Sequence, residues 1–207
     1  MAIFLWILVI VLGYALGNLN GALIISKLLM HDDVRTHGSG NAGLTNFFRT
    51  YGGPATLLVL LIDVGKTVAA CLIAQWLLGS TGYGLEAKMA AGVAAILGHS
   101  YPAASHFKGG KGILSGAAMA AAVDWRVFCI IFAFFLVAVI CTRYVSLGSV
   151  LGGAGFAVSI CAFYWGNWVV CALGVFAGVF VIVRHRTNIV RLLHHQESKL
   201  TFHRTKE

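Results

Sequence analysis

Long apolar stretches without charge are the feature that most limits what this chain can fold into. The first such run extends from Ile3 to Ile25 and contains no Asp, Glu, Lys or Arg. At about 1.5 Å of rise per helical residue, a run of this length crosses about 30 Å of hydrocarbon. Because no Lys or Arg precedes Lys27, the segment lacks the basic start of a cleavable signal peptide. We therefore expect a retained transmembrane helix.

Six further apolar runs predict an all-α, polytopic integral membrane protein of about seven transmembrane helices. These runs cover residues 54–78, 86–101, 113–123, 127–142, 148–164 and 169–183. The chain is 59% hydrophobic and 11% charged, which is typical of membrane proteins. Several runs are shorter than the roughly 20 residues of a full span, so five spans with two partial helices are the alternative. With no linker or low-complexity tract, residues 1–207 are expected to form a single membrane-embedded domain.

The distribution of basic residues predicts the orientation of the chain in the membrane. Segments 27–49, 106–111 and 184–206, together with position 143, carry 12 of the 15 Lys and Arg residues. Since such residues concentrate on the cytoplasmic side, we expect the N-terminus outside and the C-terminus in the cytoplasm. The net charge of +8 is then explained by topology and by anionic lipid head groups, and not by nucleic acid.

A glycine-rich segment ending at Arg49 is the first of three polar clusters on the cytoplasmic side. Its glycines are interleaved with hydroxyl and carboxamide side chains, in the order Gly38, Ser39, Gly40, Asn41, Gly43, Thr45 and Asn46. Glycines let backbone N–H groups close on an anion, and a guanidinium can bind phosphate through two N–H groups. The alternative is a turn between helices in which Thr45 or Asn46 is the N-cap.

The second cluster contains two lysines separated by a pair of glycines. It begins at Gly98–His99 and ends in Lys108–Gly109–Gly110–Lys111–Gly112. We expect a phosphate clamp, with a basic anchor at the membrane surface as the alternative. It is not a nucleotide P-loop, because Gly112 follows Lys111 where that motif requires Ser or Thr, and no strand precedes it.

The third cluster extends the last apolar run. Helical spacing places His185, Asn188 and Arg191 near one face, which offers an imidazole, a carboxamide and a guanidinium to a ligand. The alternative is the basic end of a membrane helix with snorkelling arginines. Within an earlier run, Asp63 and Lys66 are predicted to form an ion pair, since an unpaired charge there is costly.

In order and in wording, these clusters resemble the bacterial membrane glycerol-3-phosphate acyltransferases that use acyl phosphate as donor. The family's patterns G-S-G-N-x-G-x-T-N-x-x-R, G-H-x-x-P-x-x-x-x-F-K-G-G-K-G and R-H-R-x-N-I-x-R-L stand intact at residues 38–49, 98–112 and 184–192. The stretch 142–147 is also similar. The chain departs from the family's usual residues at 18–20 and at His194–His195.

The resemblance implies a seven-helix bundle in the bacterial cytoplasmic membrane, with the active site on the cytoplasmic side. It implies transfer of a fatty acyl group from acyl phosphate to the 1-hydroxyl of sn-glycerol 3-phosphate, giving lysophosphatidate for phospholipid synthesis. The expected partners are these two substrates and membrane lipids. No cofactor, metal, nucleic acid or obligate protein partner is expected.

The resemblance also implies the residues of the site. Catalytic roles are expected for Lys108, Ser146, His185 and Asn188. Substrate-binding roles are expected for Ser39, Gly40, Asn41, Gly43, Thr45, Asn46, Arg49, His99, Gly109, Gly110 and Lys111. Arg49 and Lys108 are expected to bind glycerol phosphate, and Ser39 with the 38–43 backbone the acyl phosphate. His185 is either the general base or a phosphate ligand, and in the second case the substrate's own phosphate takes the proton.

Four alternatives to this interpretation were compared with the sequence. The His-x-x-x-x-Asp acyltransferase machinery is excluded, because none of the eight histidines has Asp five positions later. The motifs do not by themselves exclude acyl-CoA as donor. A phosphate-ester transporter would need polar residues on both sides and usually an internal repeat, and neither is found. A metal site is disfavoured, because adjacent His194 and His195 do not share a helical face and few carboxylates lie nearby.

Overall fold

The computed structural model describes residues 2–200, which form α-helices and short 3-10 turns without a strand. The basic residues Arg204 and Lys206, used above for the orientation, lie outside the described residues. The helices are α1 (Ala2–Gly17), α2 (Gly21–Leu29), α3 (Leu44–Tyr51), α4 (Ala55–Leu78), α5 (Gly84–Ser100), α6 (Ile113–Val123), α7 (Trp125–Thr142), α8 (Val145–Phe163), α9 (Trp168–Arg184) and α10 (Arg186–Leu193). The 3-10 turns are Val34–Thr36, Gly79–Thr81 and Ala103–Ser105. All-α architecture, as predicted, is confirmed.

The first apolar run forms two helices and not the single helix that was predicted, although Ala2–Leu29 together is long and apolar enough for a membrane span. α1 ends at Gly17 and α2 begins at Gly21. Between them Asn20 adopts an extended conformation, and its Oδ1 accepts a hydrogen bond of 3.0 Å from the backbone N–H of Leu23. An Asn side chain that caps a new helix competes with continuation of the old one. Hydropathy does not report this competition.

Each of the other six apolar runs coincides with one helix, but these helices differ in their capacity to cross a membrane. Within the described residues, four segments are long and apolar enough for a span: Ala2–Leu29, Ala55–Thr81, Trp125–Thr142 and Val145–Phe163. A fifth span results if α9 and α10, which meet at a bend of 56°, are taken together. α5, with 17 residues, and α6, with 11 residues, are shorter.

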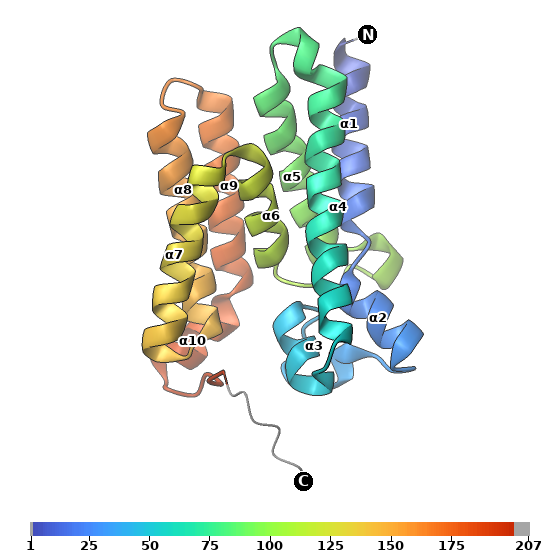
Figure 1. Cartoon of the computed structure of the whole chain (residues 1–207), viewed down its shortest axis with the longest axis vertical. Helices are drawn as coiled ribbons and strands as arrows, with labels where there is room; N and C mark the ends of the chain where they lie inside the picture. The colour runs from blue at the N-terminus through green and yellow to red at the C-terminus, as the bar shows by residue number, and fades with distance from the viewer. Residues whose placement is uncertain (1, 201–207) are drawn as a thin grey trace.

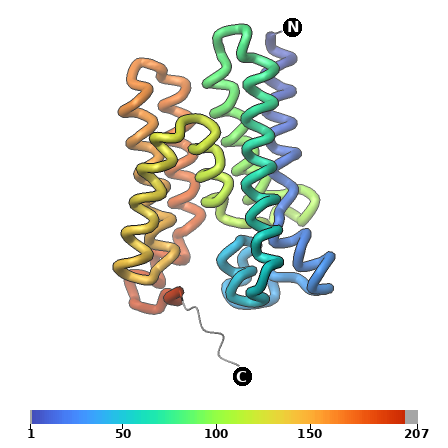
Figure 2. Tube along the Cα trace, viewed as in Figure 1, coloured from blue at the N-terminus to red at the C-terminus, as the bar shows by residue number. Residues whose placement is uncertain are grey.

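The long helices form two groups with α6 between them. α1, α4 and α5 pack together on one side, and α7, α8 and α9 on the other (Figures 1 and 2). Close approach within a group depends on glycine. A methyl group at Gly17 would overlap the carbonyl of Ala95 across the α1–α5 contact, and one at Gly178 would approach the Gly153 carbonyl across the α8–α9 contact.

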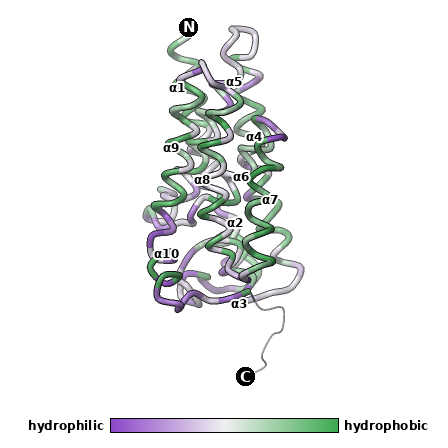
Figure 3. Tube along the Cα trace, turned by 90° about the vertical axis from the view of Figure 1, so that its left-hand side faces the viewer, coloured by the Kyte–Doolittle hydropathy of each residue, from purple (hydrophilic) through white to green (hydrophobic). Residues whose placement is uncertain are grey.

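Polar segments gather at one end of the bundle. α2, α3, α10 and the loops around them lie at the end opposite the N-terminus (Figure 1), where the hydrophilic colouring is concentrated (Figure 3). Large apolar side chains such as Ile3, Trp76 and Ile140 are 77%, 80% and 75% exposed along the helices. Exposure of this kind over a helical bundle indicates a lipid-facing surface.

Candidate active site

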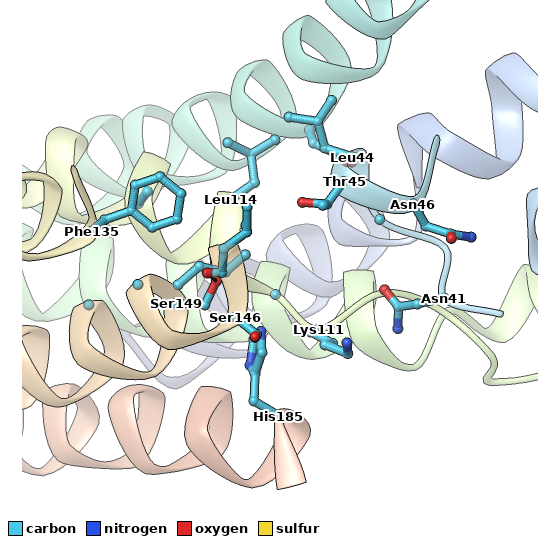
Figure 4. A pocket seen from close by; sticks show the side chains of 18 of the residues that line it. Asn41, Leu44, Thr45, Asn46, Lys111, Leu114, Phe135, Ser146, Ser149 and His185 are labelled. Carbon is cyan, nitrogen blue, oxygen red and sulfur yellow. Dashed lines mark hydrogen bonds between the residues drawn. The ribbon is translucent and has the colours of Figure 1, made fainter. Parts of the chain in front are cut away.

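A cavity of about 750 Å³ is lined by residues of both helix groups and of the loops and short helices at the polar end of the bundle. One part is lined by polar side chains from the three sequence clusters, and the other by apolar side chains of α4, α6 and α7 (Figure 4). Segments up to about 150 residues apart in the chain therefore share one site, as from Ser39 to Asn188.

The first glycine-rich loop is held in place by Asn46. Its Oδ1 accepts a hydrogen bond of 2.9 Å from the backbone N–H of Ser39, and its Nδ2 donates to the carbonyls of Val34 at 3.0 Å and His37 at 3.1 Å. Gly38 adopts a φ of +54° beside this carboxamide, and an added methyl there would overlap Oδ1. The N-cap of α3 is Gly43, without a side-chain cap, so the alternative with Thr45 or Asn46 as N-cap was wrong.

The two lysines of the second loop have different environments. Gly109 and Gly110 are buried under His99, and the N–H of Gly110 donates to the His99 carbonyl at 3.1 Å. Beyond this packed pair, Lys111 lines the cavity, and its Nζ donates to Oδ1 of Asn188 at 2.6 Å. Lys108 is exposed and does not line the cavity. Burial, followed by the repulsion of Arg191, lowers the pKa of Lys111 to about 8.

The third cluster is bent, and not the straight extension of α9 that was predicted. The chain turns by 56° at His185, between α9 and α10. His185 Nδ1 lies 2.8 Å from the carbonyl of Val181. Because a carbonyl only accepts, this contact places the proton on Nδ1 and leaves Nε2 of the neutral ring as an acceptor. His185, Asn188 and Arg191 all line the cavity despite the bend.

A carboxylate that sequence reasoning missed lies among these cations. Glu197 accepts hydrogen bonds from Nδ2 of Asn188 at 2.8 Å and from Nε of Arg191 at 2.7 Å. Burial by itself raises the pKa of Glu197, but the hydrogen bonds from Arg191 and Asn188 leave it lowered. Next to it, the carbonyl of Ser198 accepts from Nη2 of Arg49 at 3.0 Å. In the sequence, Glu197 is an acidic residue in a basic C-terminal segment, and this pattern does not indicate that it lies in the site.

A buried network of charged and titratable side chains lies at the wall of the cavity. The predicted ion pair between Lys66 and Asp63 is confirmed, with 2.7 Å between Nζ and Oδ1. His99 joins it, since its Nδ1 lies 2.9 Å from the same ammonium. The three side chains are at most 5% exposed. Asp63 and His99 also line the cavity.

The apolar part of the cavity is a limb between three helices. α4 contributes Leu60, Val64 and Val68, which are four residues apart and so share one face. The other walls are α6 and α7, which contribute Leu114, Ala117, Ala121, Phe128, Phe132 and Phe135. All of these side chains are apolar, so this limb suits a hydrocarbon chain.

Most of the predicted site residues come together. Those that line the cavity are Ser39, Asn41, Gly43, Thr45, Asn46, Arg49, His99, Lys111, Ser146, His185 and Asn188. Gly40, Lys108, Gly109 and Gly110 do not line it. Ser146, His185 and Lys111 all line the cavity, and their side chains are labelled in Figure 4. Among the residues from 2 to 200, no group of three or more His, Cys, Asp or Glu side chains is placed to bind a metal ion.

The charge distribution indicates what the site can bind. Arg49, Lys111 and Arg191 bring three cationic side chains to the polar part, while the loops add hydroxyl, amide and backbone N–H donors. Such a set of donors suits the oxygens of one or two phosphate groups. A ligand that carries both phosphate and a long hydrocarbon chain would use both parts of the cavity.

Comparison with known proteins gives a consistent result. A family model described as glycerol-3-phosphate acyltransferase matches residues 7–195. A protein of that name from Thermoanaerobacter sp. (strain X514) is 37% identical over 194 residues, which are 94% of this chain and 95% of the relative. One from Clostridioides difficile (strain 630) is 37% identical over 201 residues, which are 97% and 98% of the two chains.

Solved structures of the same kind share the fold. The crystal structure of PlsY, an integral membrane glycerol 3-phosphate acyltransferase, in its glycerol 3-phosphate form matches with a TM-score of 0.86 and 31% identity, over 95% of this chain and 96% of that one. Its lysophosphatidic acid form matches with a TM-score of 0.81 and 30% identity, over 95% of each chain.

Proposed function

The chain belongs to the glycerol-3-phosphate acyltransferase family, and on that premise we propose that it transfers a fatty acyl group from acyl phosphate to the 1-hydroxyl of sn-glycerol 3-phosphate. The products are lysophosphatidate and inorganic phosphate. The relatives are named for glycerol 3-phosphate, and one solved neighbour is a lysophosphatidic acid form, which supports both the acceptor and the product.

The two-part cavity is the observation that carries this proposal. Its polar part offers Arg49, Lys111 and Arg191, and its apolar limb runs between α4, α6 and α7. Acyl phosphate has the same two parts, a phosphate head and a hydrocarbon tail. We assign the tail to the limb and the head to the first glycine-rich loop, with the glycerol phosphate beside it.

The chemistry needs little from the protein beyond binding and proton removal. The 1-hydroxyl oxygen attacks the acyl carbonyl carbon, a new ester C–O bond forms, and the C–O bond to phosphate breaks. Phosphate is a good leaving group, so no acyl-enzyme is required. Cations at the polar end reduce the repulsion between two anionic substrates and hold them in reacting geometry.

His185 is the proposed base for the attacking hydroxyl. Its Nδ1 is committed to the Val181 carbonyl at 2.8 Å, so Nε2 carries the lone pair that can accept the proton. With this tautomer, His185 is better suited to act as a general base than to bind phosphate, because an unprotonated Nε2 cannot donate a hydrogen bond to a phosphate oxygen. In the other route the substrate's own phosphate takes the proton.

The membrane arrangement completes the proposal. We place the enzyme in the bacterial cytoplasmic membrane with seven transmembrane helices, α1, α4, α5, α6, α7, α8 and α9, and with the active site at the cytoplasmic face. The polar end that carries α3 and α10 supports this orientation (Figure 3), together with the basic residues of its loops.

A two-donor assay tests the function. Detergent-purified protein is given labelled glycerol 3-phosphate with palmitoyl phosphate in one reaction and palmitoyl-CoA in a parallel one. Lysophosphatidate from the acyl phosphate alone is the expected result. Product from the thioester alone would replace the proposed donor, and no product from a folded sample with either donor would contradict the acyl-transfer proposal.

A further inference from the structure

We propose that Lys66 is a positioning residue that holds the proton of His99 on Nε2, so that this ring donates a hydrogen bond to an oxygen of a bound phosphate substrate. The inference rests on the function proposed above. It assigns a role to a buried lysine on α4 whose ammonium group contacts Asp63 and His99, two residues that line the cavity.

The ammonium group of Lys66 has the acceptors that it needs. Its Nζ lies 2.7 Å from the carbonyl oxygen of Leu19, 2.7 Å from Oδ1 of Asp63 and 2.9 Å from Nδ1 of His99. An ammonium carries three N–H donors and no acceptor. Each donor therefore has one partner, and the bond to the ring requires a lone pair on Nδ1. A neutral imidazole with a lone pair on Nδ1 has its proton on Nε2.

The side-chain amide of Asn20 is a second hydrogen-bond donor that favours a lone pair on Nδ1 of His99. Nδ2 of Asn20 lies 3.5 Å from Nδ1 of His99. The orientation of this carboxamide is determined, because its Oδ1 accepts from the N–H of Leu23 at 3.0 Å and its Nδ2 donates to the carbonyl of Ala42 at 3.0 Å. The amide nitrogen thus faces Nδ1 and disfavours a proton there.

The acceptor recorded near Nδ1, the Oδ1 atom of Asp63, already accepts two other hydrogen bonds. Oδ1 of Asp63 lies 3.4 Å from Nδ1 of His99. It accepts from Lys66 at 2.7 Å and from the N–H of Gly21 at 3.1 Å. Both bonds are shorter than the contact with the ring. A proton on Nδ1 would also remove the acceptor of the third Lys66 donor, and an unsatisfied buried donor is costly.

The other ring nitrogen is left for a ligand. Within the described residues, no protein hydrogen bond is found for Nε2 of His99, although the side chain is only 3% exposed and lines the cavity. Nε2 faces Gly110, where an added methyl group would overlap it. The second loop therefore packs closely against this ring nitrogen, and the proposal requires a bound oxygen to reach Nε2–H from the cavity that the His99 side chain lines.

The state of the ring can be read directly by nitrogen NMR on the full-length protein in detergent. The histidines are labelled with ¹⁵N, and His99→Gln assigns the signals of this ring among the eight histidines. In the wild type we expect an unprotonated Nδ1 and a protonated Nε2. Addition of inorganic phosphate should shift the Nε2–H resonance, since the proposal gives it a phosphate oxygen as acceptor.

Two variants separate positioning from folding. Lys66→Met removes the donor but leaves Asp63 without its partner, so Asp63→Asn/Lys66→Met is made as well to avoid an unpaired buried charge. In both we expect the proton to redistribute towards Nδ1 and the response of Nε2 to phosphate to be lost. Lys88→Met is the matched control, because Lys88 Nζ donates to the Ala122 carbonyl at 3.1 Å, away from the cavity lining.

Kinetics give the second readout. The KM for at least one of the two phosphate substrates should rise about 10- to 100-fold in the double variant, as expected for loss of one hydrogen bond to a charged group, while Lys88→Met keeps the wild-type KM. A structural role alone would reduce the fraction of active protein and leave KM unchanged.

Three results would overturn the inference: a proton on Nδ1 in the wild type, an unchanged tautomer in both Lys66 variants, or an Nε2–H resonance that does not respond to phosphate. The NMR readout does not depend on turnover. Absence of acyl transfer by the wild type would therefore count against the proposed function, while the expected spectra would still support this role of Lys66.

Discussion

At the scale of single residues, Lys108 and Lys111 differ in a way that their sequence context does not reveal. Both belong to one short motif, in which Lys108 follows Phe107 and Lys111 follows Gly110. In the structure Lys111 lines the cavity and contacts Asn188 at 2.6 Å. Lys108 is exposed, its carbonyl accepts from Arg35 at 3.3 Å, and its backbone N–H donates to the Ser105 carbonyl at 3.2 Å. The buried Gly109–Gly110 pair separates the two environments.

Substitution of these lysines should therefore have unequal effects on activity. Lys111→Met removes a preorganised cation from the phosphate end and should lower kcat/KM by about 10²- to 10³-fold. Lys108→Met should cost less than about 10-fold, the scale of an exposed charge. The measurement is the initial rate of lysophosphatidate formation with both substrates varied. A larger loss of kcat/KM in Lys108→Met than in Lys111→Met would show that the second loop rearranges to bring Lys108 to the substrates.

Lys111 also predicts a pH dependence of phosphate binding. Burial lowers its pKa to about 8, so in the empty enzyme the side chain is charged below this pH and loses its charge above it. The affinity for inorganic phosphate should fall as the pH rises through about 8, although the ligand itself does not lose negative charge in this direction. Calorimetric titration of the wild type and of Lys111→Arg is the test.

The arginine variant is the control, since its guanidinium stays charged over the whole range. Its affinity should be nearly flat where that of the wild type falls. A fall of equal size in both proteins would assign the titration to another group.

The limits of residue-level prediction are clear in Asn46 and Glu197. Asn46 stands inside a motif and was expected to bind substrate, and it also holds the first loop through three hydrogen bonds. Glu197 stands outside every motif, and only the path of the chain after α10 brings it to Arg191 at 2.7 Å. Motif residues could be predicted from sequence, but their partners could not, because the contacts depend on how the loops pack.

At the scale of elements, the runs that become helices could be predicted, but their interruptions could not. Asn20 ends one apolar run early by capping α2, and the chain bends by 56° at His185. Both events depend on hydrogen bonds between side chain and backbone. Gly98 is a similar case, since it stands in the second motif but its position is explained by helix packing. A methyl group there would overlap the carbonyl of Tyr14 in α1.

The packing role of Gly98 predicts a stability effect. Gly98→Ala should lower the free energy of unfolding by about 1–3 kcal/mol, since α1 and α5 must separate to admit the methyl group. The matched control is Gly65→Ala in α4, where no atom lies within 4 Å of the added methyl. This control should be neutral or stabilising, because Ala favours a helix by up to about 1 kcal/mol over Gly. Thermal unfolding in detergent compares them, and equal melting temperatures would contradict the role of the α1–α5 contact.

At the scale of the whole molecule, the hydrophilic segments are concentrated at one end of the bundle (Figure 3), and we propose that this end faces the cytoplasm. Green fluorescent protein fused to the C-terminus should therefore fluoresce, and alkaline phosphatase fused at the same point should be inactive. An active phosphatase with a dark fluorescent fusion would place the C-terminus outside and reverse the proposed topology.

The cavity is the feature of the whole molecule that sequence reasoning reached only in part. Convergence of the three motifs was expected from the common side of their loops. The walls of the apolar limb could not be predicted, because Val64, Ala121 and Phe132 are indistinguishable in sequence from residues that face lipid or the core. Only the packing of α4, α6 and α7 around the cavity gives these side chains a common space.

Photolabelling with an acyl phosphonate that carries a diazirine at the end of its chain tests the two-part cavity most directly. If the acyl chain occupies the limb, crosslinks are expected on α4, α6 and α7 near Val68, Ala121 and Phe128. These crosslinks should be lost when palmitoyl phosphate is added in excess. Crosslinks confined to another apolar groove, such as that of Val175, Phe176 and Val179 on α9, would contradict the assignment of the limb to the acyl chain.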